Sequence, residues 1–133
     1  MAYPTGSGSE KLWRTCIIQQ SNTETAFRFD GTNATTGTST YTVPALHIIT
    51  VLNVVIHNQG TDPETMSMWV VPNGSGIVQL LQNQPIEGST IGSETFVWND
   101  RIVLVGGDAL KVNGGSPSNQ DLYLSYIDQN WEN

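Results

Sequence analysis

Residues 48 to 56 read Ile-Ile-Thr-Val-Leu-Asn-Val-Val-Ile, and this stretch decides the fold class. It is apolar on nearly every side, so hydrophobic periodicity alone would also allow a buried helix. Its β-branched residues and its lack of Ala, Glu and Lys favour a strand instead, because branched side chains pack well on a pleated surface. On both sides of this stretch, short apolar or β-branched runs alternate with clusters of Gly, Asn, Asp and Pro. This alternation is typical of many short antiparallel strands.

The runs predict strands at residues 12 to 19, 25 to 30, 40 to 43, 48 to 57, 65 to 71, 77 to 81, 94 to 99, 101 to 105, 109 to 112 and 121 to 129. About eight to ten short strands joined by Gly-rich turns predict an all-β fold, a single-domain antiparallel β-sandwich that is jelly-roll-like. Met66, Met68 and Val70 fall on one face of their strand. The last strand has apolar residues on both faces, so we expect it to lie centrally in a sheet or to face a neighbouring subunit.

Residues 1 to 11 are rich in Gly and Ser and are expected to form a flexible N-terminal arm, followed by a β-sandwich domain at residues 12 to 133. The start of the chain lacks the charged and apolar regions of a signal peptide, and no apolar run reaches membrane-spanning length. We therefore expect synthesis in a cytoplasm. Cys16 is the only cysteine, which excludes an internal disulfide.

Charged residues make up only 13% of the 133 residues, about half the usual share, and the net charge is -7. Five basic residues are too few to make several helices soluble, which again favours sheet structure. The negative field repels phosphate backbones and anionic lipid head groups. We therefore expect neither nucleic acid nor a membrane as a partner.

Motifs for catalysis, metal binding or cofactor binding are missing from the sequence. His47 and His57 are the only histidines and have no partners at metal-ligand spacing, and no GxSxG or dinucleotide-binding motif occurs. Asp100 and Asp108 could be proposed as a glycosidase pair, but both lie at predicted turns, where Asp bonds nearby backbone N–H groups. The sequence therefore predicts a protein that is not an enzyme and that has no metal and no cofactor.

The tryptophans suggest where other proteins could bind. Trp69 and Trp98 lie in predicted strands and are assigned to the core. Trp13 and Trp131 lie near the two ends, where either a core position or a contact between subunits fits a large aromatic ring. The spare apolar residues favour a homo-oligomer, for which a trimer is expected. The candidate interface residues are Tyr3, Pro4, Leu12, Trp13 and Trp131.

Several segments resemble a pattern common in small structural proteins of tailed bacteriophages. The first part is Tyr41-Thr-Val-Pro-Ala, then residues 48 to 58, then Met68-Trp69-Val70-Val71-Pro72-Asn73-Gly. The later part is Glu94-Thr-Phe-Val-Trp, then Ile102-Val-Leu, a Gly107-Asp108-Ala-Leu turn, and a final strand at residues 122 to 127. The resemblance covers about residues 40 to 127. The chain departs from it at Leu46, where the TVPAG form of the first motif has glycine.

This resemblance implies a virion location and a jelly-roll or related sandwich that assembles as a trimer. The implied function is that of a capsid decoration, or cement, protein, which binds the major capsid protein or another virion protein and stabilises the outside of a phage capsid. A tail-associated or receptor-binding knob that binds a glycan is the alternative. A small glycan-active enzyme using Asp100 and Asp108 is a third hypothesis, which no other site residue supports.

Overall fold

The computed structural model describes residues 9 to 92, 94 to 115 and 119 to 132. The β-branched stretch at residues 48 to 56 forms the centre of β3 (His47–Asn58). β9 (Gln120–Asn130) pairs with β3 along its length, and β1 (Ser9–Gln20) pairs with the other side of β9. The last position of this five-stranded sheet is shared by two short strands. β7 (Ile102–Val105) pairs with the first half of β3, and β6 (Thr95–Trp98) pairs with its second half.

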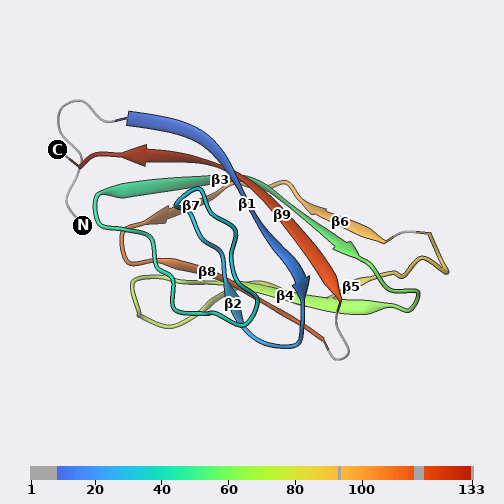
Figure 1. The fold of residues 1–133 in the computed structure, drawn as a ribbon. Helices are drawn as coiled ribbons and strands as arrows, with labels where there is room; N and C mark the ends of the chain where they lie inside the picture. The colour runs from blue at the N-terminus through green and yellow to red at the C-terminus, as the bar shows by residue number, and fades with distance from the viewer. Residues whose placement is uncertain (1–8, 93, 116–118, 133) are drawn as a thin grey trace.

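A second sheet lies below the first in Figure 1 and contains the remaining four described strands. Its order is β2 (Thr25–Ala26), β8 (Ala109–Gly114), β4 (Glu64–Val71) and β5 (Val78–Ile86). Every pairing in both sheets is antiparallel. The described residues thus contain nine strands and no helix, which confirms the prediction of an all-β antiparallel sandwich.

The core lies between the two sheets, where alternate residues of each strand point inward. Met66 and Met68 on β4 are fully buried, as are Leu124 and Tyr126 on β9. Each such side chain contributes about 1.5–3 kcal/mol by leaving water. β9 is central between β1 and β3, as its two apolar faces predict. The core cluster also includes Ile17, Phe27, Phe29, Val43, Ile49, Val51, Val54, Ile56, Leu81, Ile86, Ile102, Leu104, Leu110, Val112 and Leu122.

Most predicted strand ends differ from the structure by one or two residues, and the strand predicted at residues 77 to 81 extends to Ile86. Three larger differences have a structural reason. Residues 40 to 43 form no strand, because the Val43 backbone bonds the turn at Gly107 and Asp108 instead of a neighbouring strand. Of residues 25 to 30, only the first two are strand, although Phe27 N still donates to Leu110 O at 2.9 Å. Residues 9 to 11, assigned to the arm, belong to β1 and pair with β9. Residues 1 to 8 lie outside the described residues.

The connection between β2 and β3 shapes the surroundings of β1. Its Phe27 and Phe29 are buried, and the Phe29 ring meets Tyr126 edge-on with centroids 5.0 Å apart. The connection then follows the edge of β1, where Ala34 N donates to Cys16 O at 3.0 Å and Thr36 Oγ1 donates to Ile18 O at 2.9 Å. This loop therefore occupies the edge of the second half of β1.

Candidate protein-binding surface

The outer face of the five-stranded sheet carries two apolar rows that cross its strands. In the first row, Leu12 lies opposite Ile127, Ile127 opposite Thr50, and Thr50 opposite Val103. Leu12 is 70% exposed and Val103 61% exposed. Because the alternate residues of these strands are buried, the side chains of the row point away from the core.

The second row contains Cys16, Tyr123, Val55 and Val97, which are cross-strand neighbours in that order. Tyr123 and Val97 are each 44% exposed, and Cys16 and Val55 are half-buried. Large apolar side chains gathered on one exposed face are a feature of surfaces that bind other proteins. We call the two rows together the outer face.

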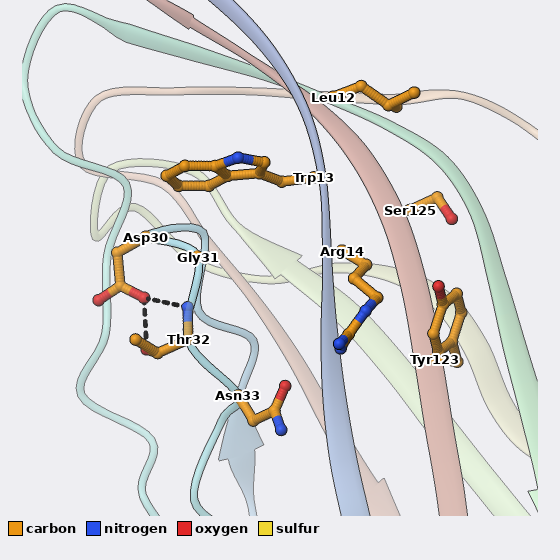
Figure 2. A pocket seen from close by; sticks show the side chains of 9 residues that line it. All are labelled: Leu12, Trp13, Arg14, Asp30, Gly31, Thr32, Asn33, Tyr123 and Ser125. Atoms are coloured by element: carbon orange, nitrogen blue, oxygen red, sulfur yellow. Dashed lines mark hydrogen bonds between the residues drawn. The ribbon is translucent and has the colours of Figure 1, made fainter.

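A groove of about 930 Å³ runs beside β1, next to the outer face. Figure 2 shows Trp13 extending from β1 toward Asp30 and Gly31, with Leu12 and Tyr123 on the other side of the strand. The Trp13 ring lies so close to Gly31 that an added Cβ would be 2.9 Å from it, and Gly31 has a positive φ of 84°. Gly31 N also donates to Tyr126 Oη at 3.2 Å, which holds the loop on the core.

The carboxylate in the groove is bound within its own loop. Asp30 accepts hydrogen bonds from Thr32 N at 3.1 Å and Thr32 Oγ1 at 2.6 Å, and it pairs with Arg28. Burial alone would raise the pKa of Asp30, but the hydrogen bonds from Arg28 and Thr32 outweigh burial and lower this pKa. The hydrogen bond to Asp30 correspondingly raises the pKa of Arg28. The carboxylate therefore orders the loop that forms one wall of the groove.

The structure places the predicted interface residues differently. Leu12 lies on the outer face, and Trp13 points to the opposite side of β1, where its ring meets Tyr126 edge-on at 6.4 Å. Trp131 follows β9 and is half-buried, and its backbone N donates to Leu46 O at 3.0 Å. Tyr3 and Pro4 lie outside the described residues. Leu12 and Trp13 therefore line one groove, whereas Trp131 is not among its lining residues.

Sequence reasoning did not select the exposed members of the outer face on β6, β7 and β9. Val97, Val103 and Tyr123 look like ordinary strand residues in the sequence. The two-sided apolar pattern of residues 122 to 127 was a signal for Tyr123 alone. Trp69, assigned to the core, is half-buried on the outer side of β4, because its neighbour Met68 points inward. Trp98 does pack against the core.

Of the Asp and His residues considered as site candidates in the sequence, all but Asp100 lie within hydrogen-bond distance of neighbouring groups. Asp108 is buried, and its carboxylate accepts from Asn73 N and Val105 N, each at 2.9 Å. Asp100 is exposed in the turn between β6 and β7. His47 Nδ1 lies 2.9 Å from Asp128 Oδ1, and His57 Nδ1 lies 3.1 Å from Thr95 Oγ1. Among the described residues, no group of three or more His, Cys, Asp or Glu side chains is placed to hold a metal ion.

Within the same described ranges there is no apolar helix of membrane-spanning length. Comparison of the chain with protein-family models, with curated protein sequences and with solved structures finds no match.

Proposed function

We propose that this protein is a virion structural protein that binds other protein subunits through its outer face, as a decoration protein on the outside of a phage capsid. The observation that carries the binding part is the pair of apolar rows on the five-stranded sheet. Leu12 and Val103, at opposite edges of the sheet, are each more than 60% exposed. No described segment covers them.

The partner in this proposal is a protein surface with apolar side chains at its centre and basic residues around them. The chain carries a net charge of -7, so its field would steer a basic partner toward it. Arg14 is the one Lys or Arg among the outward-pointing residues of β1, β3, β6, β7 and β9. The sequence resemblance at residues 40 to 127 is what supports a phage capsid as the partner.

The test uses capsids from which the protein has been removed, together with charge substitutions on each sheet. Val103→Asp should weaken rebinding at least tenfold, since it places a carboxylate in the middle of an apolar contact. Ile77→Asp is the matched control, because Ile77 is 64% exposed and lines a groove beside Trp69 on the other sheet. Equal binding by the two variants would show that the outer face is not the surface that binds the capsid. Failure of the unmodified protein to bind or to heat-stabilise capsids would remove the decoration function.

A receptor-binding knob is the second candidate, and the groove at Trp13 is the observation in its favour. A half-buried tryptophan beside Asn33 and Arg14 offers a stacking surface and polar groups to a sugar ring (Figure 2). The carboxylate of Asp30, however, already accepts bonds from Thr32 and Arg28. Glycan binding that quenches tryptophan fluorescence and that is lost in Trp13→Ala would favour this candidate over the first.

A further inference from the structure

The first half of β1 is an open sheet edge. Cys16 O accepts from Ala34 N, so the main-chain groups of Cys16 point away from β9. In an antiparallel ladder every second residue has the same orientation, so the main-chain groups of Glu10, Leu12 and Arg14 also point away from β9. Among the described residues, no hydrogen bond from another segment reaches these groups. An open edge of this kind can pair with another strand.

The connection between β2 and β3 limits the open edge to residues 10 to 14. Thr15 Oγ1 donates to Thr32 O at 3.1 Å, and the bonds of Ala34 and Thr36 take up the edge at residues 16 and 18. The same connection forms the far wall of the groove that Leu12, Trp13 and Arg14 line. A strand that paired with β1 would therefore enter this groove and pair with a window of about five residues.

The sequence of the window, Glu10-Lys11-Leu12-Trp13-Arg14, is complementary to itself when reversed. In an antiparallel pairing of two copies about Leu12, Glu10 of each copy lies opposite Arg14 of the other. Both side chains lie on the outer side of the sheet, so the pairing forms two ion pairs. On the opposite side, Lys11 of each copy lies opposite Trp13 of the other. Within one copy Lys11 Nζ already lies 4.8 Å from the Trp13 ring centroid, so this cation–π contact is present before pairing.

The register follows from the same residues. In each hydrogen-bonded pair of an antiparallel ladder, both residues point their main-chain groups toward the partner strand. Only registers that place even-numbered residues opposite even-numbered residues can therefore form these pairs. Moving the centre from Leu12 to residue 11 or 13 loses both Glu10–Arg14 pairs. The register centred on Leu12 also brings together two copies of an apolar side chain that is 70% exposed in one copy.

We infer that two copies of this chain pair antiparallel through residues 10 to 14 of β1, about a two-fold axis at Leu12. The pairing joins the two five-stranded sheets and places their outer faces in one continuous surface. It closes at two copies, because an isologous contact uses the same patch on both partners. The free protein is therefore a dimer in place of the trimer expected from its sequence. This inference goes beyond the proposed function and does not depend on a capsid.

The test is a charge swap at the two positions that face each other. Glu10→Arg makes residues 10 and 14 both positive, and Arg14→Glu makes both negative, so each variant repels its own copies. Each should remain near the monomer mass of 14.5 kDa in sedimentation equilibrium, while the unmodified protein approaches twice this mass. Because the contact is small, concentrations from about 5 µM to about 1 mM are needed.

Mixing the two variants decides the register. Glu10→Arg has two positive positions and Arg14→Glu two negative ones, so a 1:1 mixture should form the dimer that neither forms alone. Asp100→Arg and Arg101→Glu are the matched controls, because these neighbouring exposed residues undergo the same charge changes away from β1. Circular dichroism verifies that each variant is folded.

A covalent trap gives an independent measurement. In a Cys16→Ser background, Leu12→Cys places two thiols opposite each other at a Cα separation of about 5.5 Å, which a disulfide can bridge. It should give a disulfide-linked dimer under mild oxidation, whereas Val103→Cys, on the far edge of the sheet, should not. The inference is overturned if the unmodified protein stays monomeric, if the single charge variants associate like the unmodified protein, or if their mixture does not associate. Loss of capsid binding alone would overturn only the proposed function.

Discussion

The buried carboxylate of Asp108 gives the sharpest test of how the sandwich is held together. Its two oxygens accept hydrogen bonds from Asn73 N and Val105 N, each at 2.9 Å, and its backbone O accepts from Val43 N at 2.8 Å. The residue thus joins the turn after β4, the end of β7 and the loop before β3. Asp108→Ala removes both carboxylate oxygens and leaves Asn73 N and Val105 N without these acceptors.

The expected loss follows from the two bonds. A hydrogen bond to a charged group contributes about 1.5–3 kcal/mol, and both donors are only partly buried, so the low end applies and the sum is about 3 kcal/mol. Unfolding entropy of about 2.1 cal/mol/K per residue gives about 0.28 kcal/mol/K for this chain. The melting temperature should therefore fall by about 10 °C. Asp108→Asn keeps one oxygen acceptor and should lose about half as much.

The assay is urea and thermal unfolding followed by tryptophan fluorescence and circular dichroism. Asp100→Ala is the control, because Asp100 is exposed and should change stability by no more than about 0.5 kcal/mol. A loss of less than about 1 kcal/mol in Asp108→Ala would refute the reasoning. It would show that water replaces the carboxylate at both N–H groups, and the turn would then not depend on this residue.

Three further results are expected. Leu46, which takes the place of glycine in the resembled motif, has a positive φ of 63°, so Leu46→Gly should be more stable in urea than Leu46→Ala by about 1 kcal/mol, the reverse of the usual order. Burial raises the pKa of Tyr126 from 10.0 to about 12, so the stability that its neutral phenol contributes is complete below pH 10 and is lost, by roughly 2–3 kcal/mol in all, as the pH rises through 12. Urea titrations across this range should show the decrease, and Tyr126→Phe should reduce it. Gly31→Ala should lower stability by about 1–2 kcal/mol and shift tryptophan fluorescence, because its Cβ would meet the Trp13 ring in a backbone region that disfavours side chains; an unchanged spectrum would contradict this contact.

Local patterns were sufficient to predict the strands that pair over a long length. β3 and β9 were found because branched and alternating residues continue for about ten positions, and a long run leaves little room for another interpretation. The inward direction of Met66 and Met68 followed from the same alternation. These features depend on the side chains of one segment, so one segment is enough to predict them.

Residues 40 to 43 show where such patterns fail. Tyr41, Thr42 and Val43 have strand composition, yet their segment is a loop, because Val43 bonds Gly107 and Asp108 in the turn between β7 and β8. The pairing partner decides whether an extended segment becomes a strand, and the partner lies more than 60 positions away in the sequence. The altered residue of the motif, Leu46, was noticed in the sequence. Its strained backbone became visible only in the structure.

The candidate surface was predictable only in part. Leu12 was selected, but Val103 and Tyr123 were not, since alternation does not tell which of two apolar faces meets the second sheet. Trp13 was selected as an interface residue. In the structure its side chain lines the groove and also packs against Gly31. The sequence could not show that residues 31 to 36 return to β1, because this depends on the burial of Phe27 and Phe29.

An open edge on an apolar sheet can pair with further copies and lead to fibres, and the two edges of this sheet differ in a way that opposes this. On the β1 side, the loop at residues 31 to 36 leaves a window of about five residues, and Glu10 and Arg14 favour one register within it. On the opposite side, the edge is divided between β6 and β7, which are interrupted from Asn99 to Arg101. A strand that paired with β7 would meet this interruption, so long continuous pairing is blocked there. In the proposed dimer, association through β1 therefore stops at two copies and leaves the outer face available to another partner.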